Sequence, residues 1–218
     1  MKRKALWRKA LWAGLLAIVI LLACAGCQRE LPREEKEVVK GYASWPSYSF
    51  EEAIAEAKTI VYGKAVSKSD VIEEVTSPPE GLDGGEGVTD TNYYCEVSLE
   101  PITLVKGEAG EDGEVAVRDF EVETDTKIYD TDGVDPIELE QEYVFFLNEY
   151  NVFFGPSMMM LVEDGQVSTS VLPTSVKEEI LVEQGKDLDD YANMNMEQVY
   201  VENAMPVEEY LALIEEAM

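Results

Sequence analysis

Three aspartates in one short acidic segment are the residues best placed to bind a ligand. Asp130, Asp132 and Asp135 are followed closely by two glutamates. Calcium takes about six to eight oxygen ligands, and flexible acidic loops outside the cell can supply them. The spacing is not that of an EF-hand, because the glycine comes too early and the twelfth-position glutamate is missing. The segment is therefore a candidate for a weak calcium site, beside the simpler interpretation of a solvated acidic surface.

The composition excludes several kinds of chemistry. Histidine is absent, which removes Ser-His-Asp and Cys-His catalysis and His-zinc sites. With 45 acidic and 17 basic residues the formal charge is -28, which excludes nucleic-acid binding through a basic surface. A carboxylate pair can serve an acid-dependent hydrolase, but an acid-rich sequence does not select a pair. We therefore expect no enzyme, no cofactor and no nucleic-acid partner, and keep the hydrolase as a minor alternative.

The N-terminus has the pattern of an export signal. Five basic residues lie within residues 1–9, and residues 10–27 are uncharged and mostly apolar. A basic segment before an apolar one is typical of a secretory signal. An uncleaved anchor helix is the alternative, since the uncharged run nearly spans a bilayer core. Either interpretation predicts that the remaining chain is outside the cytoplasm.

The apolar run ends in Leu-Leu-Ala-Cys-Ala-Gly-Cys, which resembles the lipobox of bacterial lipoproteins. Cys24 fits this motif best, with an aliphatic residue three positions before it and a small one directly before it. Cys27 has the small pair but lacks the usual leucine, and is the alternative. The resemblance implies acylation of one of these cysteines and a lipid-anchored protein on the extracytoplasmic face of the cell membrane.

These segments predict three parts of the chain. Residues 1–23 are the expected signal peptide, the highly charged residues 24–42 a tether, and residues 43–218 one acidic domain. Cys95 is then the only cysteine of the domain, and its place in a strand-like run predicts a buried, unreactive thiol.

Hydrophobic periodicity predicts a mainly β domain with flanking helices. Ser49 followed by Glu52 is a capping box that begins a short helix. An amphipathic helix is expected after Pro206, and another helix over residues 175–184. Apolar alternation predicts strands, and an Asp-Gly pair at 164–165 predicts a hairpin. The expected strands cover residues 59–67, 92–106, 114–123, 142–150, 152–162 and 166–171.

Two stretches of the domain carry no strand or helix pattern. Residues 125–140 are interpreted as an acidic loop, and residues 186–203 have mixed polarity and are not assigned. The run over 142–150 is the strongest strand, in which Phe145 and Phe146 are expected to be buried. Short strands at this spacing favour a five- to six-stranded OB-like β-barrel over a parallel sheet.

The order of these elements resembles the netrin-like/TIMP-like family. The residues that carry the resemblance are 53–67, Thr-Leu-Val-Lys-Gly at 103–107 and Gln-Glu-Tyr-Val-Phe-Phe-Leu at 141–147. The family implies an OB-type five-stranded barrel. Its inhibitory members use a free N-terminal cysteine to chelate a protease zinc, and no cysteine begins the domain here. The expected function is therefore a non-catalytic binding module with an unknown protein or glycan partner, with an inhibitor or regulator of an envelope protease as the alternative.

Overall fold

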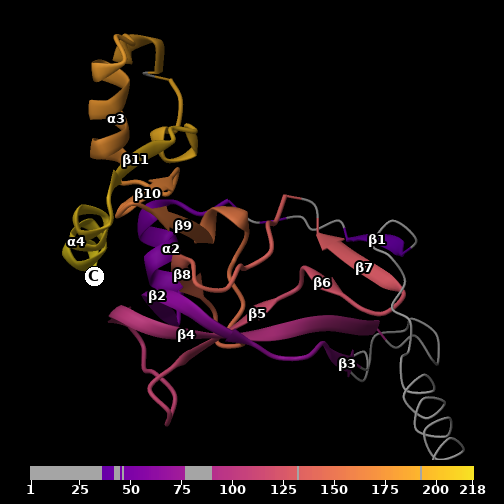
Figure 1. Ribbon diagram of the computed structural model, residues 1–218. Helices are drawn as coiled ribbons and strands as arrows, with labels where there is room; N and C mark the ends of the chain where they lie inside the picture. The colour runs from indigo at the N-terminus through magenta and orange to yellow at the C-terminus, as the bar shows by residue number, and fades with distance from the viewer. Residues whose placement is uncertain (1–35, 42–44, 46, 77–89, 132, 192) are drawn as a thin grey trace, which may run out of the picture. The chain divides into compact units, whose positions relative to one another are not determined.

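The computed structural model describes residues 36–41, 45, 47–76, 90–131, 133–191 and 193–218. One compact unit spans Val38–Met218. It is mainly β with helices, as the sequence predicts, and Figure 1 shows how its elements follow one another. Residues Glu37–Gly41, which belong to the expected tether, form the strand β1.

The larger sheet has eight strands in the order β11-β10-β9-β8-β2-β4-β3, with β5 added on β4. Its centre is β2, which pairs antiparallel with β8 on one side and with β4 on the other. Residues 125–140 were expected to be an acidic loop, and they contain the strand β7 (Lys127–Thr131). The strands of the larger sheet are β2 (Thr59–Lys68), β3 (Ile72–Thr76), β4 (Asp90–Lys106), β5 (Val115–Asp119), β8 (Glu142–Leu147), β9 (Met159–Glu163), β10 (Gln166–Thr169) and β11 (Asn203–Pro206).

No sheet among the described residues closes into a barrel, and the expectation of a closed OB-like barrel was wrong in this respect. The reason lies at β9. One edge of β9 pairs with β8, and the other pairs with β10, which in turn pairs with β11. The edge of β9 that would meet β5 in a closed barrel is therefore occupied by the C-terminal strands, and the sheet continues instead of closing.

The pairing of the long strand β4 with β2 is irregular near Gly63. Gly63 lies opposite Pro101, and the pairing register shifts between Tyr62 and Gly63. A Cβ at position 63 would stand 2.9 Å from the carbonyl oxygen of Glu100, so only glycine allows this approach of the two backbones.

A second sheet has three strands in the order β1-β7-β6. These are β1 (Glu37–Gly41), β7 (Lys127–Thr131) and β6 (Val122–Glu123). Lys40 of β1 lies 4.0 Å from Asp130 of β7, a distance between Nζ and Oδ2 typical of a surface ion pair. The acidic segment of the calcium hypothesis therefore begins as a strand and not as a loop.

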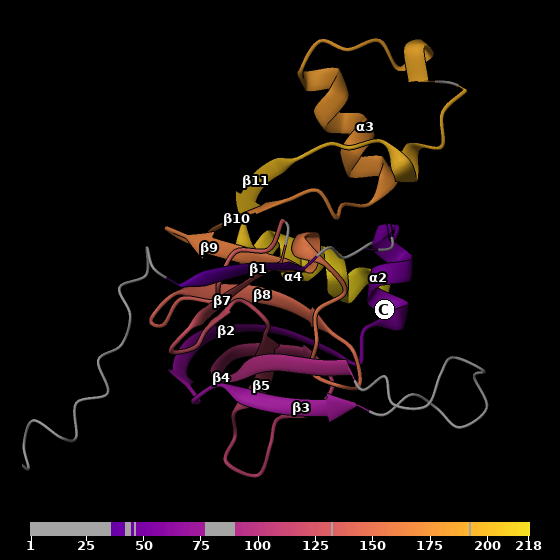
Figure 2. The same cartoon turned by 90° about the vertical axis from the view of Figure 1, so that its right-hand side faces the viewer.

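Helices α2 (Phe50–Glu56) and α4 (Val207–Ala217) lie side by side against the larger sheet (Figure 2). The capping box of α2 is confirmed, because Ser49 accepts from the Glu52 amide while Glu52 accepts from the Ser49 amide. Phe50 packs on Tyr210 with ring centroids 6.3 Å apart. The Tyr210 side chain is fully buried and donates to the carbonyl of Val171 at 3.1 Å.

Helix α3 (Thr174–Glu183) and the short 3-10 helices η3 (Leu188–Tyr191) and η4 (Met196–Gln198) lie between β10 and β11 in the chain. A third 3-10 turn, η2 (Pro156–Met158), precedes β9. Lys177 of α3 is only 5% exposed and donates to the carbonyls of Glu197 and Val199, at 2.8 and 3.1 Å. Burial lowers the pKa of Lys177. This lysine ties α3 to the segment that the sequence left unassigned.

The core is centred on β8, as predicted. Phe145 and Phe146 are both fully buried. The Phe145 ring packs on Tyr143 and Phe153, with centroids 5.4 and 6.1 Å away. Cys95 is buried and unpaired, as expected for the lone cysteine of the domain.

Candidate functional site

The residues singled out from the sequence are not brought together by the described structure. Cys24, Cys27 and Asp132 lie outside the described residues. Asp130 lies on β7 beside Lys40, and Asp135 is exposed beyond it. Within the described ranges, no group of three or more Asp, Glu, Cys or His side chains is arranged to hold a metal ion. Calcium binding by this segment stays a prediction.

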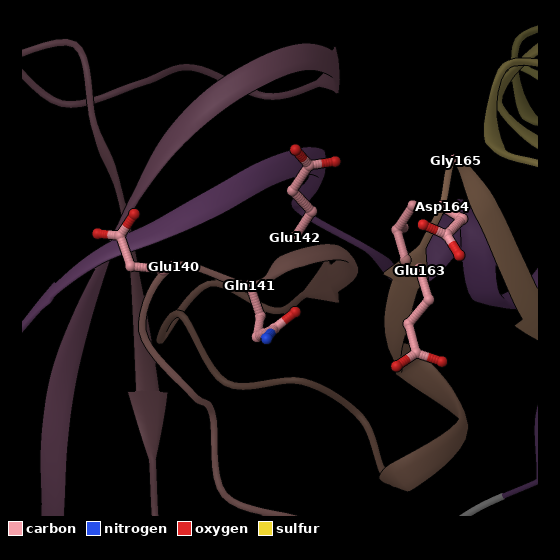
Figure 3. Close-up of a pocket in the computed structure, with 7 residues that line it drawn as sticks. Glu140, Gln141, Glu142, Glu163, Asp164 and Gly165 are labelled. Atoms are coloured by element: carbon pink, nitrogen blue, oxygen red, sulfur yellow. The ribbon is translucent and has the colours of Figure 1, made fainter.

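An acidic pocket of about 510 Å³ lies between the start of β8 and the turn that joins β9 to β10 (Figure 3). Four of its lining residues carry carboxylates. The close-up shows that they come from two separate stretches of the chain, one before β8 and one at the turn. The pocket is lined by Glu140, Gln141, Glu142, Val162, Glu163, Asp164 and Gly165.

Local backbone geometry places these carboxylates. The amide of Glu140 donates to the carbonyl of Ala65, and the carbonyl of Gln141 accepts from the amide of Ala65, at 2.8 and 2.9 Å. These two hydrogen bonds fix residues 140–141 against β2 just before β8 begins. At the other wall, Asp164 and Gly165 have φ of 51° and 74°, which fits the hairpin turn predicted from the Asp-Gly pair. The pocket walls are therefore set by backbone hydrogen bonds and a tight turn.

Two of the four carboxylates have side-chain partners. Lys64 Nζ lies 2.5 Å from Oε2 of Glu140, and this hydrogen bond raises the pKa of Lys64, so the amine stays charged. Glu140 is 72% exposed, so solvent screens this ion pair. The hydroxyl of Tyr62 donates to Oε2 of Glu142. Among the described residues, no ion pair engages Glu163 or Asp164.

Tyr62 remains a neutral donor over the physiological pH range. Burial of its ring, followed by the hydrogen bond and charge of Glu142, raises the pKa of Tyr62 to about 12. The pocket thus offers hydrogen-bond acceptors with negative charge and one neutral phenol behind them. Such an arrangement suits ammonium or guanidinium groups, which donate several hydrogen bonds to carboxylates.

The raised pKa of Tyr62 predicts a stability loss at high pH. The pKa of this phenol in the folded chain exceeds its value of about 10 in the unfolded chain. Its contribution to the free energy of unfolding is therefore fully present below about pH 10. That contribution is lost as the pH rises from about 10 to about 12. We expect Tyr62→Phe to lose less stability than the unaltered chain between these pH values, measured by urea unfolding. Equal losses in the two proteins would contradict the raised pKa of Tyr62.

Comparison with known proteins leaves the site without an assigned role. No protein-family model matches the chain, and the curated proteins contain no sequence match. In the described part of the chain, none of the helices has the length and apolar character needed to cross a membrane.

Sequence reasoning missed this pocket. The sequence placed Glu140 in an acidic loop, Glu142 in a core strand and Glu163 at a turn. It therefore gave no sign that these three residues line one pocket. The pairing of Glu142 with Val162 brings the two stretches of chain side by side, with the side chains of Glu142 and Glu163 on opposite faces of the sheet (Figure 3). The sequence predicts both the strand that begins at residue 142 and the Asp-Gly turn at 164–165. That these two segments are neighbours follows only from the pairing of β8 with β9.

Proposed function

We propose that this chain is an extracytoplasmic lipoprotein, anchored through Cys24 or Cys27, whose domain binds a cationic partner without catalysis. The basic and apolar N-terminus, followed by the lipobox-like cysteines, supports the anchor and the location at the cell membrane. The expected partner is a protein segment rich in Lys or Arg. We propose no cofactor and no nucleic-acid ligand for the domain.

The acidic pocket is the observation that supports binding of a cationic partner. Four residues with carboxylates line it, with Glu142 and Glu163 on opposite faces of the sheet, and among the described residues a lysine pairs with Glu140 alone of the four. A cavity lined by one sign of charge concentrates ligands of the opposite sign and accelerates their association. The formal charge of -28 acts in the same direction over longer distances.

Strand order supports a relation to OB-like domains. The four strands β8-β2-β4-β5 are adjacent in this order, so the fourth strand returns beside the first. This is the Greek-key arrangement, on which the partly open OB barrel is built. We propose that the domain is an OB-like, netrin-like fold opened by the C-terminal strands. OB folds bind diverse ligands, in agreement with a binding role.

An inhibitor or regulator of an envelope protease is the second candidate. The observation that favours it is the placement of α3, which in both views lies beyond β10 and away from β2 and β4 (Figures 1 and 2). A segment that extends from a sheet can enter a cleft of another protein. This role would use α3 rather than the acidic pocket, so the two candidates make separable predictions.

Peptide binding tests the first candidate. The full chain in detergent micelles is titrated with a fluorescent Lys-rich peptide and with a Glu-rich peptide of the same length. We expect binding of the Lys-rich peptide only, weakening as salt is added because the attraction is screened. We expect Glu142→Gln/Glu163→Gln to weaken binding at least about tenfold, as for the loss of charge-assisted hydrogen bonds.

A matched control separates the pocket from the general charge of the surface. Glu215 and Glu216 are exposed on α4, outside the pocket, and their double change to Gln removes the same charge. We expect this control to bind the peptide as the unaltered chain does. Equal weakening in the two double variants would mean that the peptide responds to net charge alone, which overturns the pocket assignment.

A further inference from the structure

Strand β5 is paired on one side only within the described part of the chain. It lies beside β4, and no other described strand pairs with it (Figure 1). In a closed barrel β5 would meet β9, but the available edge of β9 is taken by β10. The open sheet therefore leaves β5 with an outer edge. A strand edge of this kind is a template on which another chain can pair.

The register of β4 and β5 shows which backbone groups lie on this outer edge. Paired residues of an antiparallel ladder alternate between those that exchange hydrogen bonds and those whose backbone groups point apart. The amide of Arg118 donates to the carbonyl of Asn151 at 2.9 Å, away from β4. Its ladder partner Glu96 bonds through its amide and its carbonyl with Ser69, away from β5. Ala116 lies two residues before Arg118, so its N–H and C=O also point outward.

The free part of the edge lies at Ala116 and opens into a cavity. Asn151 occupies the edge at Arg118, so the open stretch runs from Ala116 toward the β4–β5 turn, residues 107–114. On this side, the backbone of Ala116 has no hydrogen-bond partner among the described residues. Ala116 and Asn151 both line a pocket of about 720 Å³. Ala116 is half-buried and has a small side chain, which leaves room for a further strand.

The turn at the end of this edge gives it a negative charge. The basic residue of β5, Arg118, is already engaged, since its Nη1 lies 3.1 Å from Oε2 of Glu74 and its guanidinium carbon lies 4.4 Å from the centre of the Tyr94 ring. The lining of the pocket contains no Lys or Arg. An added segment therefore meets charge of one sign, which is complementary to Lys and Arg side chains. The acidic residues of the lining are Glu108, Glu111, Asp112 and Glu114.

We propose that the outer edge of β5 binds an extended segment of a partner protein as an added strand. The segment pairs with the backbone of Ala116 and carries Lys or Arg residues that meet the acidic turn. In this mode of recognition, main-chain hydrogen bonds give the affinity and the side chains give the specificity. The β5 edge and the acidic pocket beside β8 share no lining residue, so the inference does not rest on the proposed function.

Peptide titration of the full chain in detergent micelles tests this assignment. The probes are the peptide Val-Lys-Val-Lys-Val-Lys, the same peptide methylated at its central backbone nitrogens, and Val-Glu-Val-Glu-Val-Glu. Methylation keeps the charge and removes the backbone donors along both edges of the peptide. We expect the unmethylated Lys peptide to bind at least about fivefold more tightly than the methylated one, as for the loss of one or two hydrogen bonds. The Glu peptide should not bind.

Amide hydrogen exchange locates the bound peptide without altering the protein. In the free chain, we expect the outward amide of Ala116 to exchange faster than that of Val117, which faces Val97 of β4. Saturation with the Lys peptide should slow exchange at Ala116 at least about fivefold. The methylated peptide should have a smaller effect. NMR of the isotope-labelled chain measures each amide separately.

Variants at the edge and the turn complete the test. Ala116→Pro removes the outward N–H, and strand edges tolerate proline where the N–H faces solvent. We expect it to abolish the preference for the unmethylated peptide, whereas Ala116→Ser keeps the N–H and the preference. Glu111→Gln/Glu114→Gln should weaken binding of the Lys peptide at least about fivefold. The remote Glu215→Gln/Glu216→Gln removes the same charge and should leave it unchanged.

Three results would overturn the assignment. One is equal binding of the methylated and unmethylated Lys peptides. Another is exchange at Ala116 that the bound peptide does not slow, a result that stands even where Ala116→Pro disturbs the fold. The third is a preference for the unmethylated peptide that disappears in Glu142→Gln/Glu163→Gln, which would place the peptide in the acidic pocket instead. A preference that persists in this variant supports the β5 edge, whatever the acidic pocket binds.

Discussion

Replacing Phe145 with Ala is expected to lower the free energy of unfolding by about 3 to 5 kcal/mol. The ring is fully buried at the middle of β8, and its centroid lies 5.4 Å from that of Tyr143 and 6.1 Å from that of Phe153. Position 145 pairs with Val61 of β2 on one side and with Met159 of β9 on the other. Because strands surround the site, the neighbours have little freedom to fill the cavity that alanine leaves.

Urea unfolding followed by intrinsic fluorescence measures this loss. Tyr150→Ala is the control, since Tyr150 is 63% exposed and surface substitutions usually change stability by less than about 0.5 kcal/mol. A loss for Phe145→Ala no larger than that for Tyr150→Ala would show that β8 is not the centre of the core. The slope of the unfolding free energy against urea concentration should be the same in the two variants and the unaltered chain if only stability changes.

The sequence predicted the elements that are specified by residues close together in the chain. The capping box of Ser49 and Glu52 requires only a helix start, and it forms as expected. The apolar run of β8 and the turn at Asp164 were likewise readable, because hydrophobic alternation and turn chemistry act over a few residues.

Elements that depend on distant partners were missed. Strands β1 and β7 come from charged stretches that look like a tether and a loop, and each is a strand because it pairs with a neighbour in the three-stranded sheet. Asp119 is completely buried, which no acidic residue suggests by itself. Its carboxylate lies 2.6 Å from Lys68 Nζ and accepts from the amide of Ile137. A buried charge of this kind is tolerated only because of partners far away in the sequence.

The acidic pocket shows the same limit at the level of function. Carboxylates were plentiful in the sequence, and the acidic segment containing Asp130 drew attention because its residues are close along the chain. The structure instead assembles carboxylates from β8 and from the β9–β10 turn.

Loss of the acyl anchor is expected to change the location of the protein from the membrane fraction to the soluble fraction. In the native host, the unaltered chain should remain with membranes after a high-salt wash, because salt screens charge but does not weaken insertion of acyl chains. We expect Cys24→Ala to block lipid attachment and signal removal, so that residues 1–23 persist on the chain or the protein is released. Fractionation by centrifugation and mass spectrometry of the N-terminus measure both outcomes.

Cys27→Ala is the matched control, because it removes a thiol three positions away and leaves the lipobox-like Leu-Leu-Ala-Cys run unchanged. If Cys24 is the acylated residue, Cys27→Ala should keep the lipid, the cleaved N-terminus and membrane retention. The opposite pattern would assign the lipid to Cys27. Two acyl chains hold a protein stably where a single chain binds reversibly, so partial acylation should appear as partial release on washing. Normal processing and full retention in both variants would leave an uncleaved N-terminal helix as the anchor and remove the lipoprotein assignment.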